Sequence, residues 1–279
     1  MASRAYAHNM TETLDPGVVR DQYDSQLRMW LPARLPVGAV VETDGPVLRV
    51  GEVYGRGFVG YVSVAGLAGA DLDALIARQR DHFAARGQAV EWKLHGHDEP
   101  GDLAERLRAA GFEPEDPETV VVGLAAPLAD PEPSLSDGVR LEEVTARVDL
   151  DAIAEMEARV WGGDQSHRAD TLEAELAANP AGTTIVVARA GDEVVCAGWV
   201  RYMAGTAFAS LWGGSTLAQW RKKGLYTALV RYRAALAVAR GYRYLQVDAS
   251  DDSRPILQRL GFVAVTTTTP YVFTPSGPG

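Results

Sequence analysis

Cysteine is nearly missing from this chain of 279 residues, with Cys196 as its only example. A single cysteine excludes a disulfide framework within the chain and a zinc site built from several thiolates. Cys196 lies in the apolar stretch 194–199, which has the composition of a buried strand. We therefore expect a packed thiol rather than a nucleophile, and we expect no metal site.

Long apolar runs and an excess of basic residues are missing as well. No stretch is long and apolar enough to cross a bilayer, and residues 1–13 are polar, without the apolar centre of a secretion signal. Lys and Arg number 27 against 37 Asp and Glu, which gives a net charge of -10. A nucleic-acid-binding protein usually carries the opposite sign. The sequence predicts a cytoplasmic protein without a nucleic-acid or membrane partner; its acidity suits a cationic amine ligand and a generic acidic surface equally.

What the chain does have is an ordinary globular composition, with 47% hydrophobic and 23% charged residues, and an internal repeat. In the first half, Ala-Arg-Gly at 85–87 is followed by a strand-like segment at 89–94, a short helical segment at 103–107 and Gly-Phe at 111–112. In the second half, the same series is found at 239–241, 244–247, 256–260 and 261–262. This ordered series predicts a duplicated α/β domain.

A linker is predicted between the two halves. Residues 125–138 contain three prolines and several turn-forming residues, so we expect an extended and irregular segment. We place the domain boundaries at 1–126 for the first domain, 127–138 for the linker and 139–279 for the second domain.

Hydrophobic periodicity predicts the secondary structure. Helices are expected at 17–30, 71–86, 149–161, 168–178 and 224–239, and strands at 37–41, 47–53, 58–64, 139–144, 184–190, 193–203, 207–212, 244–247 and 263–273. This alternation predicts mixed sheets with helices on both faces.

The clearest chemical signal is a group of cations at the start of a predicted helix. A strand that runs into two glycines at 211–216 is followed by Arg221, Lys222, Lys223 and Gly224, where the long helix begins. The free N–H groups of a helix N-terminus and its dipole attract anions, and glycine allows the backbone to approach a phosphate closely. Because cations are slightly unfavourable at that end of a helix, their presence favours a bound anion over a merely solvated basic turn.

The order of these segments resembles that of the GNAT superfamily of N-acetyltransferases. Arg221-x-x-Gly224-x-Tyr226 is similar to the pyrophosphate loop of that superfamily, and the Leu-Gly-Phe at 260–262 is similar to the one that starts its last strands. The resemblance covers residues 139–273 and is weaker in the first half. It implies an α/β (α+β) chain with two GNAT-like domains, each a mixed twisted sheet flanked by helices.

The first half lacks the phosphate loop. Residues 65–71 are rich in glycine, but this segment contains no R-x-x-G pattern, and no Lys or Arg occurs from residue 65 until Arg78. We therefore expect a degenerate GNAT-like domain that shapes the acceptor pocket or supports the second domain.

The second half departs from the family pattern at three positions. Tyr226 stands where the loop usually has Gly or Ala, so its side chain must avoid the phosphates or stack near the cofactor. Ser250 stands where many members have Asn. Leu257 stands where many members have a Tyr that protonates the departing thiolate, and leucine cannot donate a proton.

The resemblance implies acetyl-CoA as a co-substrate and direct transfer of its acetyl group to an amine of a small molecule or peptide. Backbone groups near the end of the strand are expected to bind the pantetheine arm, and one N–H to polarise the acyl carbonyl. The expected cofactor-binding residues are Ser215, Thr216, Arg221, Lys222, Lys223, Gly224, Leu225, Tyr226, Thr227, Ser250 and Ser253.

An amine must lose a proton before it attacks, and the thiolate must gain one. Candidates for the base are Asp248, Glu157, Asp164 and His167, and candidates for the acid are Ser253, Ser250, Tyr226 and solvent. Asp248, Glu157, Ser253 and Tyr226 form the predicted catalytic set. The missing Tyr also leaves open a non-catalytic acyl-CoA-binding or sensory module. Either a monomer or a homodimer is expected.

Overall fold

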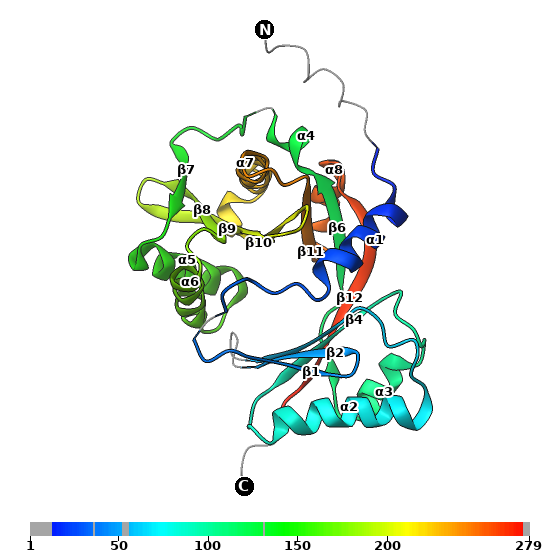
Figure 1. Ribbon diagram of the computed structural model, residues 1–279. Helices are drawn as coiled ribbons and strands as arrows, with labels where there is room; N and C mark the ends of the chain where they lie inside the picture. The colour runs from blue at the N-terminus through cyan, green and yellow to red at the C-terminus, as the bar shows by residue number, and fades with distance from the viewer. Residues whose placement is uncertain (1–12, 36, 52–55, 131, 276–279) are drawn as a thin grey trace. The chain divides into compact units, whose positions relative to one another are not determined.

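A computed structural model describes residues 13–35, 37–51, 56–130 and 132–275 (Figure 1). The chain folds into two compact units, and each is described by itself. Unit 1 consists of Met1–Asp21, Val121–Val247 and Pro255–Val265, and unit 2 consists of Gln22–Val120, Asp248–Arg254 and Thr266–Gly279.

Unit 1 is built around a sheet with the strand order β7-β8-β9-β10-β11-β6. Its elements are β6 (Glu118–Leu124, from Val121 onward), α4 (Ala125–Ala129), β7 (Val139–Val144), α5 (Arg147–Trp161), α6 (His167–Ala178), β8 (Thr183–Ala190), β9 (Glu193–Tyr202), β10 (Phe208–Thr216), the 3-10 turn η1 (Ala218–Trp220), α7 (Leu225–Ala239), β11 (Tyr244–Ala249, to Val247) and α8 (Arg254–Arg259, from Pro255). Helices α5 and α6 lie on one face of the sheet and α7 lies on the other (Figure 1). Strand β9 is therefore covered on both faces, which is why 194–200 are all buried and mostly apolar.

Unit 2 is built around a smaller sheet with the order β1-β2-β3-β4-β12, and β5 pairs with β12. Its elements are β1 (Val40–Asp44), β2 (Val47–Gly51), β3 (Gly57–Tyr61), α2 (Gly69–Ala84), β4 (Val90–His95), α3 (Leu103–Ala109), β5 (Glu113–Pro114) and β12 (Val263–Phe273, from Thr266). Helix α1 (Pro16–Leu27) contributes residues to both units. The core of unit 2 is centred on the fully buried side chains of Leu72, Phe83 and Trp92.

The series of elements predicted from the repeat is present in both halves. At the end of α2, Gln88 N–H bonds the carbonyl of Phe83 at 3.1 Å, and at the end of α7, Tyr242 N–H bonds the carbonyl of Ala237 at 3.0 Å. The two short helices end alike: Phe112 N–H bonds Leu107, and Phe262 N–H bonds Leu257. The fold is thus a mixed α/β architecture in which the same helix, strand and short helix occur twice.

The last strand of each half is found in the unit formed mainly by the other half. Strand β6 follows α3 in the chain, yet its neighbour in the sheet of unit 1 is β11. Strand β12 follows α8, yet it pairs antiparallel with β4 in unit 2, with Thr268 opposite His95 and Phe273 opposite Val90. Each compact unit is therefore made of segments that are discontinuous in sequence. The predicted domain boundaries, 1–126 and 139–279, describe the two copies of the repeat and stay a prediction.

Three corrections to the sequence prediction concern unit 1. Residues 125–129, expected to be irregular, form α4; Pro127 lies in its first turn, where the missing N–H breaks no helical bond. Strand β6 was not predicted. Strand β10 does not end at Trp212 but continues through two glycines to Thr216. Among the described residues, no helix has both the length and the apolar character needed to span a membrane.

Candidate active site

The site in unit 1 begins where β10 separates from β11. These parallel strands pair from Phe208 opposite Tyr244 to Ser210 opposite Gln246. Strand β10 then continues to Thr216 while it remains paired with β9 on its other side. Beyond Ser210, backbone groups on the β11 side of β10 are therefore available to bind a ligand, as expected for a strand that contacts an extended cofactor arm.

A β-bulge interrupts β10 just beyond this point. Gly213 lies opposite Gly198 and Ser215 lies opposite Ala197, which leaves Gly214 as the extra residue. Both bulge glycines have positive φ, 71° and 94°. A side chain at Gly214 would meet the ring of Tyr226 at 2.7 Å. The ring of Tyr226 therefore packs against the bulge, at the open end of the strand.

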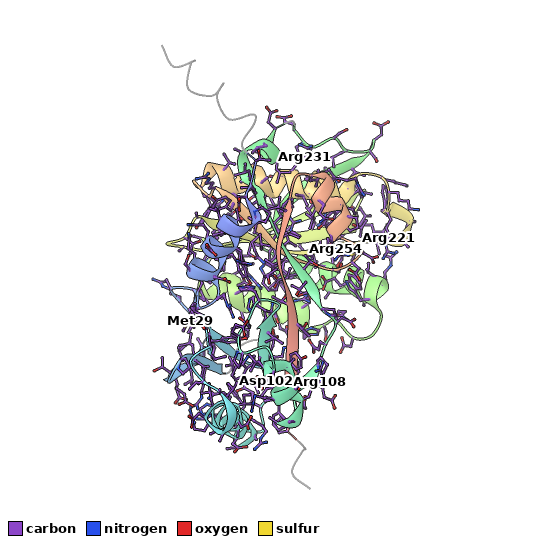
Figure 2. The ribbon with its side chains drawn as sticks, turned by 90° about the vertical axis from the view of Figure 1, so that its right-hand side faces the viewer. Met29, Asp102, Arg108, Arg221, Arg231 and Arg254 are labelled. Carbon is purple, nitrogen blue, oxygen red and sulfur yellow. The ribbon has the colours of Figure 1, made fainter. Side chains whose placement is uncertain are left out.

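Helix α7 begins with a set of exposed cations. Gly224, with φ of 80°, is its N-cap; no side chain caps the helix, and its first turn contains no acidic residue. Because the first N–H groups of a helix have no partner within it, this end can accept an anion. Arg221, Lys222 and Lys223 are exposed directly before it, and Figure 2 shows Arg221 at the outer edge of unit 1.

The loop before α7 is ordered by local contacts. Arg221 Nε donates to the carbonyl of Thr216 at 3.2 Å, and Lys223 Nζ lies 4.4 Å from the centre of the Trp220 ring. Lys222 has φ of 62° and is the only residue other than glycine with positive φ in the described part of the chain. A left-handed backbone conformation at a lysine is unfavourable by about 1–2 kcal/mol, so the surrounding contacts must stabilise this conformation of the loop.

A buried carboxylate lies beside the end of β10. Glu157 on α5 is 3% exposed. One of its oxygens accepts a hydrogen bond from Ser215 Oγ at 3.3 Å, and the other accepts one from Arg168 Nε at 2.8 Å. The indole N–H of Trp161, an exposed residue at the end of α5, donates to Ser215 Oγ at 2.9 Å. The structure therefore brings together two predicted site residues, Glu157 and Ser215, about the bulge.

Two other residues of unit 1 are confined to the core. Leu257 is fully buried, and its carbonyl accepts the N–H of Phe262 at the end of α8. Cys196 is also fully buried, and burial raises the pKa of its thiol to about 11, against nucleophilic activity. The expectation of a packed thiol is confirmed.

Three further predicted residues, Asp248, Ser250 and Ser253, belong to unit 2. Asp248 Oδ2 accepts a hydrogen bond from Lys93 Nζ at 2.6 Å. Although burial disfavours the charged amine, Asp248 and then Glu91 raise the pKa of Lys93, so its amine stays charged. Ser250 and Ser253 form a turn before α8, with their hydroxyl oxygens 3.2 Å apart.

Strands β3 and β4 of unit 2 correspond to β10 and β11, but a side chain bridges them where their pairing ends. Strands β3 and β4 pair in parallel from Gly57 opposite Val90 to Val59 opposite Trp92. Just beyond the last pair, the hydroxyl of Tyr61 donates to Asp98 Oδ2 at 2.6 Å and lies 3.3 Å from the carbonyl oxygen of Lys93. Tyr61 therefore joins the two strands where their ladder ends.

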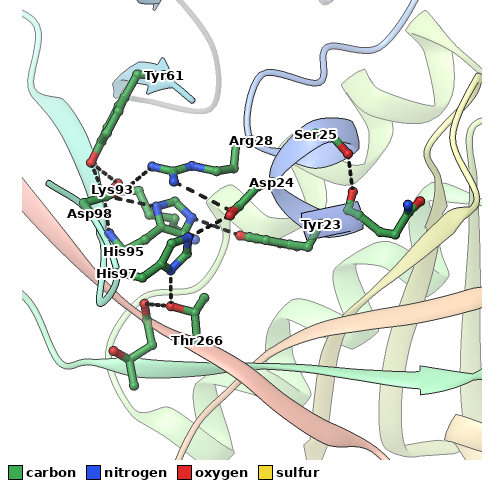
Figure 3. A network of polar contacts seen from close by, with 12 residues as sticks. Tyr23, Asp24, Ser25, Arg28, Tyr61, Lys93, His95, His97, Asp98 and Thr266 are labelled. Atoms are coloured by element: carbon green, nitrogen blue, oxygen red, sulfur yellow. Dashed lines mark hydrogen bonds and ion pairs between the residues drawn. The ribbon is translucent and has the colours of Figure 1, made fainter. Parts of the chain in front are cut away.

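A polar network surrounds Tyr61 (Figure 3). Arg28 donates to Asp98 at 2.7 Å, and the Tyr23 hydroxyl lies 3.1 Å from His95 Nε2. Burial disfavours the Asp98 carboxylate, but hydrogen bonds from His95 and Tyr61 outweigh it and lower the pKa of Asp98. Helix α2 has Asp71, an anion, in its first turn. Neither the strand separation nor the helix start of unit 2 resembles the corresponding feature of unit 1.

Comparison with known proteins agrees with this geometry. The family model described as Acetyltransferase (GNAT) family matches residues 150–262, which contain β10, the cationic loop and α7. Residues 150–262 are therefore similar to a GNAT acetyltransferase domain. No curated protein matches the sequence.

Solved structures extend the similarity of fold over the rest of the chain. A GCN5-related N-acetyltransferase from Kribbella flavida is 17% identical with a TM-score of 0.62, and the match covers 96% of this chain and 98% of that one. A tandem GNAT protein from the clavulanic acid biosynthesis pathway is 15% identical with a TM-score of 0.62, covering 95% and 98%. At these identities the comparison establishes the fold: GNAT folds cover most of the chain.

Sequence reasoning missed Arg168 as a partner of the site. It is eleven positions after Glu157, on a different helix, and no local pattern joins them. The hydrogen bond from Trp161 to Ser215 was not predicted either, because it depends on the packing of α5 against β10.

Proposed function

We propose that this protein is an acetyl-CoA-dependent N-acetyltransferase that transfers an acetyl group directly to an amine of a small molecule or a peptide. The observation that carries the proposal is the sequence of features along β10 and α7. A strand leaves its parallel partner, bulges at two glycines, and leads through three exposed cations into an uncapped helix. A thioester arm with a pyrophosphate at its far end matches these features in order.

In this proposal the cofactor lies along residues 215–227. The N–H groups at Gly224, Leu225, Tyr226 and Thr227 bind the pyrophosphate, and Arg221, Lys222 and Lys223 neutralise its charge. Peptide groups near the bulge, up to Ser215 and Thr216, hold the pantetheine arm and polarise the acyl carbonyl. Ser250 and Ser253 stay predicted cofactor contacts.

We assign proton removal from the amine to Glu157, acting with Ser215. Glu157 is buried beside the bulge, and the Ser215 hydroxyl lies against its carboxylate. Asp248 is a weaker candidate, because it belongs to unit 2, where its carboxylate is paired with Lys93 Nζ at 2.6 Å. Glu157 is likewise paired with a cation, Arg168. We prefer Glu157 because it contacts Ser215 on β10, the strand proposed to hold the acyl group.

Protonation of the departing thiolate is assigned to Tyr226 or to solvent, with Ser253 as a further candidate. The Tyr226 ring packs against Gly214, at the bulge where the thioester would lie. Leu257 has no proton to give.

We further propose that the chain is a duplicated GNAT protein with one active site, which acts in the cytoplasm as a monomer or a homodimer. The first half would be the degenerate copy. In that half, Tyr61 bridges the two strands where they separate. Helix α2 has an acidic residue, Asp71, in its first turn, whereas α7 is preceded by three cations.

Isothermal titration with acetyl-CoA tests the proposal first. Saturable binding below millimolar concentration is expected, and no binding at millimolar cofactor would exclude any acyl-CoA role. A thiol-release assay with a panel of small and peptide amines then tests for turnover.

A non-catalytic acyl-CoA-binding module is the second candidate, favoured by the buried Leu257 where an acid is often found. That function predicts tight binding of acetyl-CoA with no thiol release above the buffer rate for every amine in the panel.

A further inference from the structure

Arg233 is a buried arginine without an acidic partner. It lies on α7, is 1% exposed, and forms no ion pair with any carboxylate in the described residues. Burial lowers the pKa of Arg233, because removal from water disfavours the charged guanidinium. An unpaired charge in a protein core is unfavourable, and an apolar side chain of similar volume would avoid the cost. A specific role is therefore needed to explain it.

The guanidinium is directed at the backbone of the bulge. Its Nη1 donates to the carbonyl oxygens of Trp212 at 2.9 Å and Trp199 at 3.1 Å, and its Nε donates to Leu229 in its own helix at 3.1 Å. Trp212 and Trp199 are opposite one another in the β9–β10 ladder, and Trp212 is the residue directly before Gly213.

The neighbouring sequence leaves room for this contact. A side chain on Gly198 would approach Arg233 Nη1 to 2.8 Å. Gly198 is opposite Gly213, the first bulge residue. A bulge disrupts the regular ladder, so carbonyl groups beside it need other donors. From α7, Arg233 provides one such donor, Nη1, to the carbonyls of Trp212 and Trp199.

Unit 2 offers an internal comparison. Gln79 on α2 precedes Gly87 by the same number of residues as Arg233 precedes Gly241 on α7. Gln79 is fully buried, and its Nε2 bonds the carbonyl of Leu75 at 3.0 Å, as Arg233 Nε bonds Leu229. Beyond that, Gln79 bonds the side chains of Arg49 and Asp44 rather than a backbone. The β2–β3 ladder is regular from Val47 opposite Tyr61 to Val50 opposite Phe58. The half whose strand has a bulge therefore has Arg233 at this position, and the half with a regular ladder has the shorter, neutral Gln79.

We propose that Arg233 is a positioning residue that holds β10 in its bulged form and so fixes the peptide groups of Gly213 and Gly214 toward the acyl thioester. The claim that these peptide groups face the thioester rests on the proposed function. The claim that Arg233 holds the bulge does not, and each claim has its own measurement.

The test compares Arg233→Met, Arg233→Lys and Arg233→Gln with the matched control Gln79→Met. Hydrogen exchange over 211–216 reports on the bulge, with α5 as the internal reference, and titration with acetyl-CoA reports on the site. The carbonyls of Trp212 and Trp199 lose a hydrogen bond in Arg233→Met, so we expect exchange at 211–216 to rise about tenfold relative to α5 and acetyl-CoA affinity to fall about tenfold. Arg233→Lys keeps one strong donor, so it should recover part of the protection from exchange and part of the acetyl-CoA affinity. Relative to wild type, its kcat should be reduced by a larger factor than its KM is raised.

Gln79→Met is expected to lower the melting temperature without changing exchange at 211–216 or cofactor affinity. A folded Arg233→Met or Arg233→Gln protein with wild-type exchange at 211–216 would overturn the proposal. If Arg233→Met does not fold, the Lys and Gln variants decide. If the wild type does not bind acetyl-CoA, the proposed function fails, while the exchange data still decide whether Arg233 holds the bulge.

Discussion

The hydroxyl of Ser215 on β10 donates a hydrogen bond to the buried carboxylate of Glu157 on α5, over 3.3 Å. This contact joins the strand that is proposed to hold the acyl group to the residue that is proposed to accept a proton. Arg168 holds the other carboxylate oxygen at 2.8 Å and so fixes the orientation of the group. A carboxylate held in this way can act through one hydroxyl or one water.

Replacing Glu157 by Gln should reduce kcat by about a hundredfold, because general-base catalysis contributes on the order of 10²–10⁴. Acetyl-CoA affinity should change little, since the carboxylate is not a phosphate ligand. Steady-state thiol release gives kcat, and calorimetric titration gives the affinity. Glu155, exposed on the same helix, is the control, and Glu155→Gln should behave as wild type. Equal kcat in the two variants would rule out Glu157 as the base.

Replacing Gly224 by Val should strongly weaken acetyl-CoA binding. Gly224 has φ of 80°, and a side chain there would meet no protein atom within 4 Å, so it would extend into the space proposed for the pyrophosphate. Affinity measured by titration should fall at least about tenfold, the equivalent of roughly 1.4 kcal/mol.

The chain contains a close control for that change. Gly241, just past the other end of α7, has φ of 83° and equally open surroundings. Gly241→Val introduces the same backbone strain, about 1–2 kcal/mol, without approaching the loop. Both variants should melt at similar temperatures, and only Gly224→Val should lose the cofactor. Unchanged affinity in Gly224→Val would show that the loop is not the phosphate site.

Much of the fold could be read from local patterns. The bounds of β7 and β12 were predicted to the residue, and those of α6 and α7 to within one, because caps and hydrophobic periods are local signals. Strand β6 was missed because 118–124 follow a proline and lie near the predicted linker, and its burial depends on pairing with β11, a distant segment.

The candidate site divides in the same way. The cations, Gly224 and the two bulge glycines could be recognised in sequence, because they lie within one short stretch. The contacts of Glu157 with Ser215 and Arg168 could not, since α5, α6 and β10 meet only in the fold. The position of the Tyr226 ring against Gly214 also needed the structure, whereas Tyr226 itself was among the predicted site residues.

A fragment of residues 139–279 should be much less stable than one of residues 118–279. Unit 1 includes β6 and α4, in which Val121, Val122 and Leu128 are buried, and Ala125 N–H bonds the carbonyl of Arg243 at 2.9 Å. Losing these three side chains removes roughly 5 kcal/mol of apolar burial, which is comparable with the whole stability of a domain. It also exposes the edge of β11. Urea unfolding of both fragments measures the difference, and equal midpoints would contradict the role of β6 in unit 1.

The protein should lose stability between pH 5 and pH 8 through Glu118. Burial, followed by the charge of Asp248, raises the pKa of Glu118 to about 7 in the folded protein. Between the unfolded pKa near 4.3 and the folded value, the native state binds more protons than the unfolded one, so its stability falls as pH rises. Because Glu118 is partly exposed, the loss should be only about 1 kcal/mol. Urea unfolding of wild type and Glu118→Gln at both pH values measures it, with exposed Glu113→Gln as control. Glu118→Gln should remove that part of the pH dependence and Glu113→Gln should not, whereas identical pH profiles for wild type and Glu118→Gln would show that Glu118 titrates normally.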